Sequence, residues 1–195
     1  GFCLQSPSSS QPWKVADYKY QDKLSNVFRE HSNWNRLIGV DGLARVNKGI
    51  EVGKSKTIIQ IAEALHERKY AEIANMIYRR RDKVKLVLIA GPSSSGKTTT
   101  SKRIALQCMT LGLNPLIIEM DNYFVNRDQT PRDENGDYDF ESLQAMDLHF
   151  LNTQLNEIFS GKEVELPKVD LVKGERTFVG NKIQMKENDI IIMEG

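Results

Sequence analysis

The sequence has few cysteines, few histidines and no long apolar run. Its 195 residues include two cysteines, Cys3 and Cys108, and three histidines, all far apart, which excludes a disulfide framework and a metal cluster built on these residues. The apolar runs are far shorter than the roughly 20 residues of a transmembrane helix. No charged-then-apolar signal segment opens the chain. Because free cysteines are usual in a reducing compartment, we predict a cytoplasmic protein without membrane association.

The sequence also lacks an excess of charge of either sign. It holds 27 Lys and Arg against 26 Asp and Glu, which argues against a general nucleic-acid-binding surface. A local basic run, Arg79-Arg80-Arg81, is a candidate for contact with phosphate or RNA. The alternative, which we favour because the run is short, is a set of cations that stabilises the C-terminal end of a helix.

One stretch fits the phosphate-binding loop pattern G-x-x-x-x-G-K-[ST]. Residues 91–98 read GPSSSGKT and follow the apolar run of residues 86–90, which is typical of a buried strand in a parallel sheet. Glycines let the backbone N–H groups of the loop face phosphate oxygens, and the N-terminus of a helix over residues 99–111 attracts the same anion. Lys97 is expected to reach the β- and γ-phosphates of ATP and Thr98 to bind Mg²⁺. The predicted ATP-binding residues are Gly91, Ser93, Ser94, Ser95, Gly96, Lys97, Thr98 and Thr99.

Carboxylates follow two other strand-like runs. Asp121 comes directly after residues 115–120, PLIIEM, and Glu194 comes directly after residues 190–193, IIIM. Functional groups of open parallel sheets gather at the carboxyl ends of strands, so Asp121 is a candidate general base and Glu194 a candidate that stabilises Mg²⁺. A turn-forming Asp and an ordinary strand-ending Glu are the structural alternatives. The predicted fold class is α/β, a three-layer P-loop NTPase fold with a parallel sheet. The predicted metal-binding residues are Thr98, Glu194 and Asp121.

Residues 83–195 contain, in order, GPSSSGKTT, MDNYF, YDF, LNEIFSGKEVELPKVD and IIIMEG. This ordered set resembles the uridine kinase and phosphoribulokinase family of P-loop kinases. The resemblance implies that Asp121 is the catalytic base for a sugar hydroxyl, assisted by Lys97, with ATP and Mg²⁺ as cofactors. It also implies substrate contacts from Tyr123, Glu141 and Arg176, with Glu141 on the ribose hydroxyls.

The segment of residues 167–174 departs from the uridine kinase pattern. Uridine kinases read P-x-Y-D-F with a histidine a few residues on, and that Tyr and His hold the pyrimidine. Here residues 167–171 read PKVDL, and Gly174 takes the place of the histidine, so the resemblance leaves the base open. The lid of the family and its arginines would follow Gly195. We therefore expect the 195 residues to be an excerpt of a longer protein, with little or no activity by itself.

The elements around these motifs are predicted from periodicity. Residues 141–159 repeat apolar positions with helical spacing, and residues 163–172 and 175–185 read as a strand pair. Residues 55–82 are predicted as a helical connector, in two helices with a break near residues 68–70. The connector separates residues 1–54 from residues 83–195, the N-terminal part of a P-loop kinase domain.

Residues 1–54 carry weaker signals. A short helix over residues 22–31 and strands over residues 37–40 and 44–47 predict a small α+β segment. The arrangement resembles longer bacterial proteins in which a uridine-kinase-like domain follows a small ubiquitin-like domain and a threonyl-tRNA-synthetase-like domain. Residues 1–54 are then the tail of that upstream part.

Three functions are compatible with these features. The leading hypothesis is ATP-dependent phosphoryl transfer to a nucleoside 5′-hydroxyl, as in uridine and cytidine kinases. The second is a kinase for another small alcohol or a sugar phosphate. The third is a nucleotide-binding regulatory or RNA-associated module without robust kinase activity. The expected partners are ATP and a nucleoside or similar small alcohol, with nucleic acid only through the upstream region. We also predict a homo-oligomer for the complete protein.

Overall fold

The computed structural model describes residues 6–7, 10–15, 21–170 and 173–195. Two compact units are distinguished, Gly1–Ala64 and Leu65–Gly195. The sequence-based statements on Cys3 and on residue 171 lie outside the described residues. Within the described part, no helix combines the length and the apolar character needed to cross a membrane.

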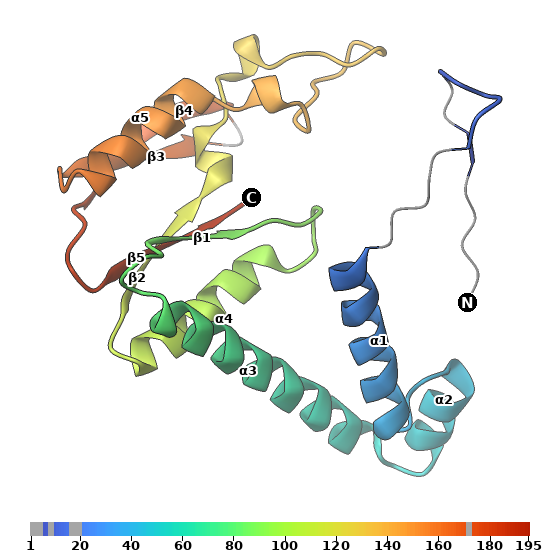
Figure 1. Cartoon of the computed structure of the whole chain (residues 1–195). Coiled ribbons are helices and arrows are strands. Elements are labelled where there is room, and N and C mark those ends of the chain that lie inside the picture. The colour runs from blue at the N-terminus through green and yellow to red at the C-terminus, as the bar shows by residue number, and fades with distance from the viewer. Residues whose placement is uncertain (1–5, 8–9, 16–20, 171–172) are drawn as a thin grey trace. The chain divides into compact units, whose positions relative to one another are not determined.

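A three-stranded parallel sheet forms the centre of the second unit. Its strands are β1 (Leu86–Ile89), β5 (Asp189–Glu194) and β2 (Asn114–Glu119), in the spatial order β1-β5-β2. All six residues of β5 are buried, as expected for a central strand whose two faces are both covered. The predicted α/β fold with a parallel sheet is confirmed, and each strand lies within a residue or two of its predicted position (Figure 1).

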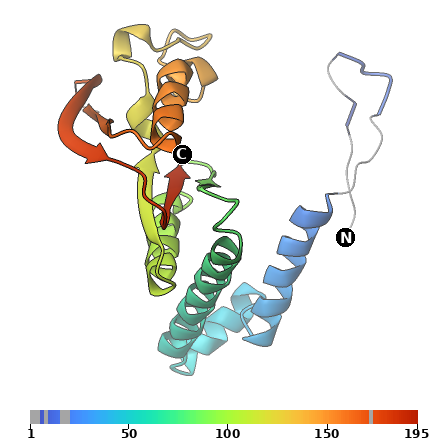
Figure 2. The ribbon, with the colours of Figure 1, turned by 60° about the vertical axis from the view of Figure 1, so that its left-hand side comes forward.

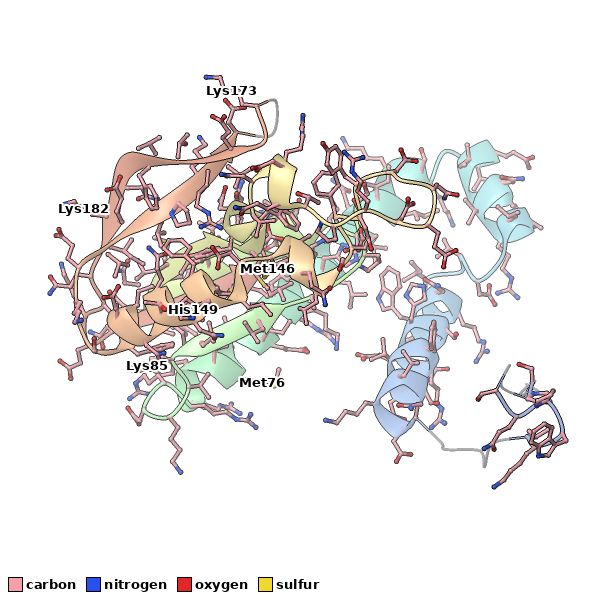
Figure 3. All side chains as sticks on the ribbon, turned by 90° about the horizontal axis from the view of Figure 1, so that it is seen from above. Met76, Lys85, Met146, His149, Lys173 and Lys182 are labelled. Carbon is pink, nitrogen blue, oxygen red and sulfur yellow. The ribbon has the colours of Figure 1, made fainter. Side chains whose placement is uncertain are left out.

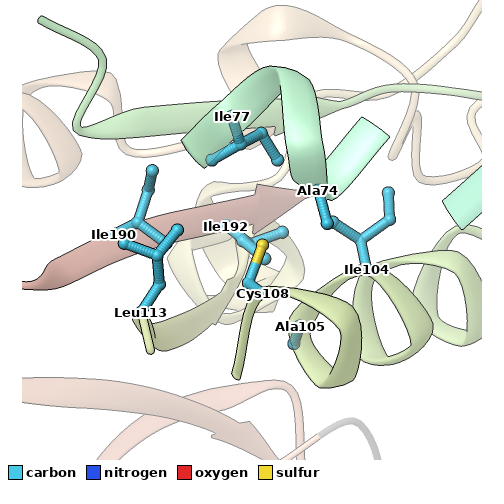
Figure 4. Close-up of a cluster of buried hydrophobic side chains, with 8 residues drawn as sticks. All are labelled: Ala74, Ile77, Ile104, Ala105, Cys108, Leu113, Ile190 and Ile192. Atoms are coloured by element: carbon cyan, nitrogen blue, oxygen red, sulfur yellow. The ribbon is translucent and has the colours of Figure 1, made fainter. Parts of the chain in front are cut away.

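Helices cover one face of this sheet. Ile190 and Ile192 of β5 pack against α4 (Lys97–Thr110) and the C-terminal part of α3 (Ser55–Arg79), and Figure 4 shows Cys108 among these side chains. Burial raises the pKa of the Cys108 thiol, and the residue is fully buried. Both facts are typical of a core residue rather than a nucleophile.

The other face of the sheet packs against a helix and a hairpin. Ile191 and Met193, which alternate with the residues of the first face, contact a cluster formed by α5 (Leu148–Phe159) and the antiparallel pair β3 (Val164–Asp170) and β4 (Glu175–Ile183). Seen in Figures 1 and 2, the sheet therefore lies between two layers. The predicted strand pair is confirmed.

Short 3₁₀ helices connect β2 to α5. These are η1 (Met120–Tyr123), η2 (Arg127–Gln129) and η3 (Leu143–Ala145). The helix predicted over residues 141–159 begins later, at Leu148, because Asp147 caps it: the Asp147 side chain accepts a hydrogen bond from the Phe150 amide at 3.0 Å. The preceding residues fold as turns, although their apolar spacing resembles a helix.

Three predictions before the phosphate loop are wrong. The runs at residues 37–40 and 44–47 are not strands, because α1 spans Asp22–Leu37 and α2 spans Leu43–Glu51. Short apolar runs do not distinguish strands from helices by period alone. Residues 55–79 form the single helix α3, without the predicted break. The apolar residues shift from one face of this helix to another while the helix itself continues. None of the residues of α1 and α2 is buried.

Removing an apolar side chain from the centre of the sheet should strongly lower the stability of the protein. Ile192 is fully buried between the sheet and the layer of α3 and α4, so we expect Ile192→Ala to lower the free energy of unfolding by about 3 kcal/mol through lost contacts and a cavity. Leu106, which is 54% exposed on α4, is the matched control, and Leu106→Ala should cost less than about 0.5 kcal/mol. Urea unfolding followed by circular dichroism measures both, and equal losses would contradict the central position of Ile192.

Candidate active site

The carboxyl ends of the three parallel strands lie in one row. Ile89 of β1, Glu194 of β5 and Glu119 of β2 are register partners. The phosphate loop leaves β1 at this row, and η1, which holds Asp121, leaves β2 at the same row. A Cβ added to Gly195 would lie 2.7 Å from the Cβ of Met120, so the residue after Glu194 closely approaches the residue before Asp121. Both predicted carboxylates therefore lie at the loop edge of the sheet.

The phosphate loop turns sharply between β1 and α4. Ser94 has φ 59° and Gly96 has φ 87°, left-handed conformations of the kind that direct successive N–H groups into an anion-binding concavity. At Gly91, a Cβ would lie 2.8 Å from the Ser95 hydroxyl, so a side chain at this position would require Ser95 to move. Helix α4 begins at Lys97, so its N-terminus faces the same concavity.

The side chains that end the loop meet the central strand. The Thr98 hydroxyl donates a hydrogen bond to Glu194 Oε1 at 2.6 Å, and Glu194 is only 5% exposed. A buried carboxylate is costly unless polar groups or a metal surround it. Lys97, by contrast, has its Nζ at the surface, where it donates to the Pro92 carbonyl at 3.2 Å.

The oxygen donors of Thr98 and Glu194 suit Mg²⁺, which protein sites bind through one or two carboxylates together with phosphate oxygens and water. No group of three or more His, Cys, Asp or Glu among the described residues is arranged to hold a metal by itself. The Thr98–Glu194 pair supplies the kind of oxygen ligands that Mg²⁺ takes beside phosphate oxygens and water.

Tyr123 does not face the site. It is 1% exposed, its hydroxyl donates to Gln154 Oε1 at 2.9 Å, and Gln154 in turn donates to the Glu165 carbonyl. Burial raises the pKa of Tyr123 to about 12, although the Arg176 charge acts in the opposite direction. The structure places this predicted substrate contact in the core, where it packs with residues of α5 and the hairpin.

Arg176 makes contacts within the protein. Its guanidinium donates to Asp147 Oδ2 at 3.0 Å and to the carbonyls of Tyr123 and Phe124 at 3.3 and 2.9 Å, and it lies 4.6 Å from the Phe150 ring centroid. Burial acts to raise the pKa of Asp147, but hydrogen bonds from the Phe150 amide and from Arg176 outweigh it, so the pKa is lowered. Arg176 thus ties β4 to the end of η1 and to the cap of α5.

Because Arg176 forms contacts within the protein, its replacement should lower the stability of the protein and not only substrate binding. We expect Arg176→Ala to lower the free energy of unfolding by about 2 kcal/mol, the range for hydrogen bonds to charged groups that are partly buried. The exposed pair Lys182–Glu163 on the same hairpin, in which Lys182 is labelled in Figure 3, is the control. Lys182→Ala should cost much less than Arg176→Ala, because an exposed ion pair contributes little to stability. Urea titration of both variants compares the two, and a cost for Arg176→Ala no larger than that of the control would refute the internal role.

A pocket of about 300 Å³ lies beside the end of η1. Sequence reasoning missed it, because its lining comes from segments that are far apart in the chain; the residues are Phe124, Val125, Arg127, Thr130, Phe140, Val169 and Gly174. Glu141, the predicted ribose contact, is exposed and directly follows Phe140, and its amide donates to Asp139 Oδ1 at 3.1 Å. The aromatic residues of the MDNYF and YDF motifs were the available signal for this pocket.

Comparison with known proteins assigns the second unit. A model of the phosphoribulokinase / uridine kinase family matches residues 86–195, which is more than half of the chain. The chain belongs to the phosphoribulokinase / uridine kinase family. The matched residues include the phosphate loop, η1, the hairpin and Glu194. The family membership inferred from the ordered motifs is thereby confirmed.

Several uridine kinases are similar to this family member. It is 31% identical over 114 residues to the uridine kinase of Lactobacillus helveticus, covering 58% of this chain and 53% of that protein. It is 37% identical over 87 residues to the uridine kinase of Schizosaccharomyces pombe, covering 44% and 19%. For the uridine kinase of Halobacterium salinarum the values are 26% over 107 residues, covering 55% and 45%. The chain thus spans about half or less of the length of these relatives.

A solved structure shares the fold. A candidate fructose transport system kinase from Silicibacter sp. TM1040 superposes with a TM-score of 0.53 at 18% identity, covering 65% of this chain and 62% of that one. At this identity the likeness speaks for the fold alone. It agrees with the parallel sheet and the layers described above.

Proposed function

We propose that this chain provides the ATP site and part of the acceptor site of a kinase that transfers the γ-phosphoryl group of ATP to the 5′-hydroxyl of a nucleoside. The observation that carries the proposal is the row of strand ends, where the phosphate loop, the Thr98–Glu194 hydrogen bond of 2.6 Å and the helical turn with Asp121 lie at one edge. Family membership supports the reaction class, and the uridine kinases among the relatives support the acceptor.

Each residue has a chemical task in this proposal. Asp121 is the general base that accepts the proton of the acceptor hydroxyl as it attacks phosphorus. The loop amides of residues 91–98 bind the phosphate oxygens, and Lys97 stabilises the charge on the transferring group. The Thr98 hydroxyl and the Glu194 carboxylate would hold Mg²⁺, which neutralises charge on the β- and γ-phosphates when it binds with ATP.

Glu141 completes the acceptor side of the proposal. It is an exposed carboxylate on a turn held by Asp139, whose side chain accepts hydrogen bonds from the amides of Glu141 and Ser142 at 3.1 Å. A carboxylate on a rigid turn can accept two hydrogen bonds from neighbouring ribose hydroxyls.

The deciding experiment is release of ADP by the complete protein from Mg-ATP, with a panel of nucleosides and sugar phosphates as acceptors. The proposal expects ADP release that depends on a nucleoside and a 5′-monophosphate product. Release with a sugar phosphate alone would keep the kinase chemistry and change the acceptor. ATP binding without acceptor-dependent release would favour a regulatory module instead.

A further inference from the structure

The turn that carries Asp121 has little support of its own. Helix η1 is a 3₁₀ helix of four residues, a form whose hydrogen bonds have poorer geometry than those of an α-helix. The bond that closes it, from the Phe124 amide to the Asp121 carbonyl, measures 3.4 Å. Asp121 is exposed, and no hydrogen bond or ion pair within the described residues holds its carboxylate. The direction of this carboxylate therefore depends on how neighbouring segments hold η1.

Asn122, the residue after Asp121, ties η1 to the hairpin. Its Oδ1 accepts a hydrogen bond from the Val169 amide of β3 at 3.1 Å, and its Nδ2 donates to Glu119 Oε2 at 3.4 Å. In Figure 1, the segment after β2 lies beside β3. Because N–H···O hydrogen bonds are usually no longer than about 3.2 Å, the bond from Asn122 to β3 is the stronger of the two.

A second asparagine makes the same contact with the other strand of the hairpin. Asn126 Oδ1 accepts a hydrogen bond from the Arg176 amide of β4, also at 3.1 Å. Val169 and Arg176 are register partners across the hairpin, so the segment of residues 122–126 is bonded to both strands at one pair of residues. Only the first of the two asparagines is adjacent to the candidate general base; the second follows it by four positions.

We propose that Asn122 is a positioning residue for phosphoryl transfer: its hydrogen bond to the Val169 amide holds η1 where Asp121 can accept the proton of the acceptor hydroxyl. The inference rests on the proposed nucleoside kinase function. A general base must lie within hydrogen-bond reach of the proton that it takes, and a misplacement of about 1 Å can cost on the order of 10²-fold in rate. Because Asn122 acts through the backbone of η1, its loss should slow the chemical step and leave the binding of both substrates nearly unchanged.

The test compares Asn122→Leu with Asn126→Leu in the complete protein, because leucine has about the size of asparagine and lacks the acceptor. Asn122→Leu should lower the single-turnover rate of nucleoside monophosphate formation by about 10- to 100-fold. The KM for the nucleoside and the Kd for ATP should stay within about threefold of wild type, the pattern of a group that acts on the chemical step. Asn126→Leu removes a bond of the same length from the same pair of strand residues and should change the rate by no more than about threefold. Urea unfolding shows whether both variants are folded under the assay conditions.

Two further variants separate the bonds of Asn122 and guard against misfolding. Glu119→Ala removes the partner of Asn122 Nδ2 and keeps the bond to β3, so its single-turnover rate should stay close to that of wild type. If Asn122→Leu does not fold, Asn122→Ser, whose shorter side chain withdraws the acceptor from β3, should show the same loss of rate.

Three results would overturn the positioning role while nucleoside kinase activity stands. They are a wild-type rate without the Asn122 acceptor, equal losses in the two asparagine variants, and a loss for Glu119→Ala as large as that for Asn122→Leu. Absence of phosphorylation of every nucleoside by the wild-type protein, with ATP still bound, would instead overturn the proposed function itself and this inference with it.

Discussion

Replacing Asp121 with asparagine is expected to lower kcat for the nucleoside by about 10²- to 10⁴-fold, the usual contribution of a positioned general base. Asn keeps the shape of the side chain but cannot take the proton of the acceptor hydroxyl. Affinity for ATP should stay within about twofold, because Asp121 lies in η1 after β2 and not in the phosphate loop. Single-turnover measurement of nucleoside monophosphate formation separates the chemical step from binding.

The matched control for this variant is Asp128→Asn. Asp128 is an exposed aspartate in η2, seven residues further on, and it lines neither the phosphate loop nor the pocket. Its replacement should leave the single-turnover rate unchanged. A wild-type rate for Asp121→Asn would remove Asp121 from the mechanism and leave the base unassigned.

Replacing Lys97 with methionine is expected to lower kcat/KM by about 10²- to 10³-fold, the effect of losing one preorganised group that stabilises charge in the transition state. The loss of stability should be small, because the Lys97 ammonium lies at the surface and donates only one weak hydrogen bond, to the Pro92 carbonyl at 3.2 Å, among the contacts described. Initial rates of ADP release over a range of ATP concentrations measure the effect.

Lys102→Met is the control on the same helix. Lys102 is an exposed lysine of α4 that lies beyond the phosphate loop, and its replacement should lower kcat/KM far less than that of Lys97, as usual for a surface substitution. If both lysine variants lose activity equally, the effect reflects the net positive charge of α4 rather than a contact of Lys97 with phosphate.

The parallel strands were the most predictable part of the fold. Residues 86–89, 114–119 and 189–194 contain continuous apolar runs with glycine or polar residues at or next to their ends, and β5, which is buried along its whole length, requires such a run. The phosphate loop was equally clear, since its glycines and Lys97 are required by the backbone turn and the anion. In these segments, the residue types that the local backbone conformation requires are also the ones that packing or phosphate binding requires, so they are visible in the sequence.

The helices before the phosphate loop were less predictable. Residues 37–40 have the composition of a strand, but Leu37 ends α1 and the other three residues directly follow it. Residues 44–47 also have the composition of a strand and lie in α2. A run of four residues is too short for its period to distinguish a strand from a helix. Helix α5 begins where Asp147 caps it. Other polar residues of the same segment could equally serve as the cap, so the first residue of this helix was not predictable.

The sequence by itself determined the family, the phosphate loop and the order of strand, loop and helix around it, because these depend on short-range spacing and on glycine geometry. Only the tertiary structure decided which side chains face the site. Tyr123 and Arg176 lie within a candidate acceptor region of the sequence, yet the fold turns one into the core and uses the other to join β4 to η1. Arg127 and Gly174 are 47 positions apart in the sequence, yet the Arg127 amide donates a hydrogen bond to the Gly174 carbonyl. Such contacts arise from long-range packing, which no local pattern encodes.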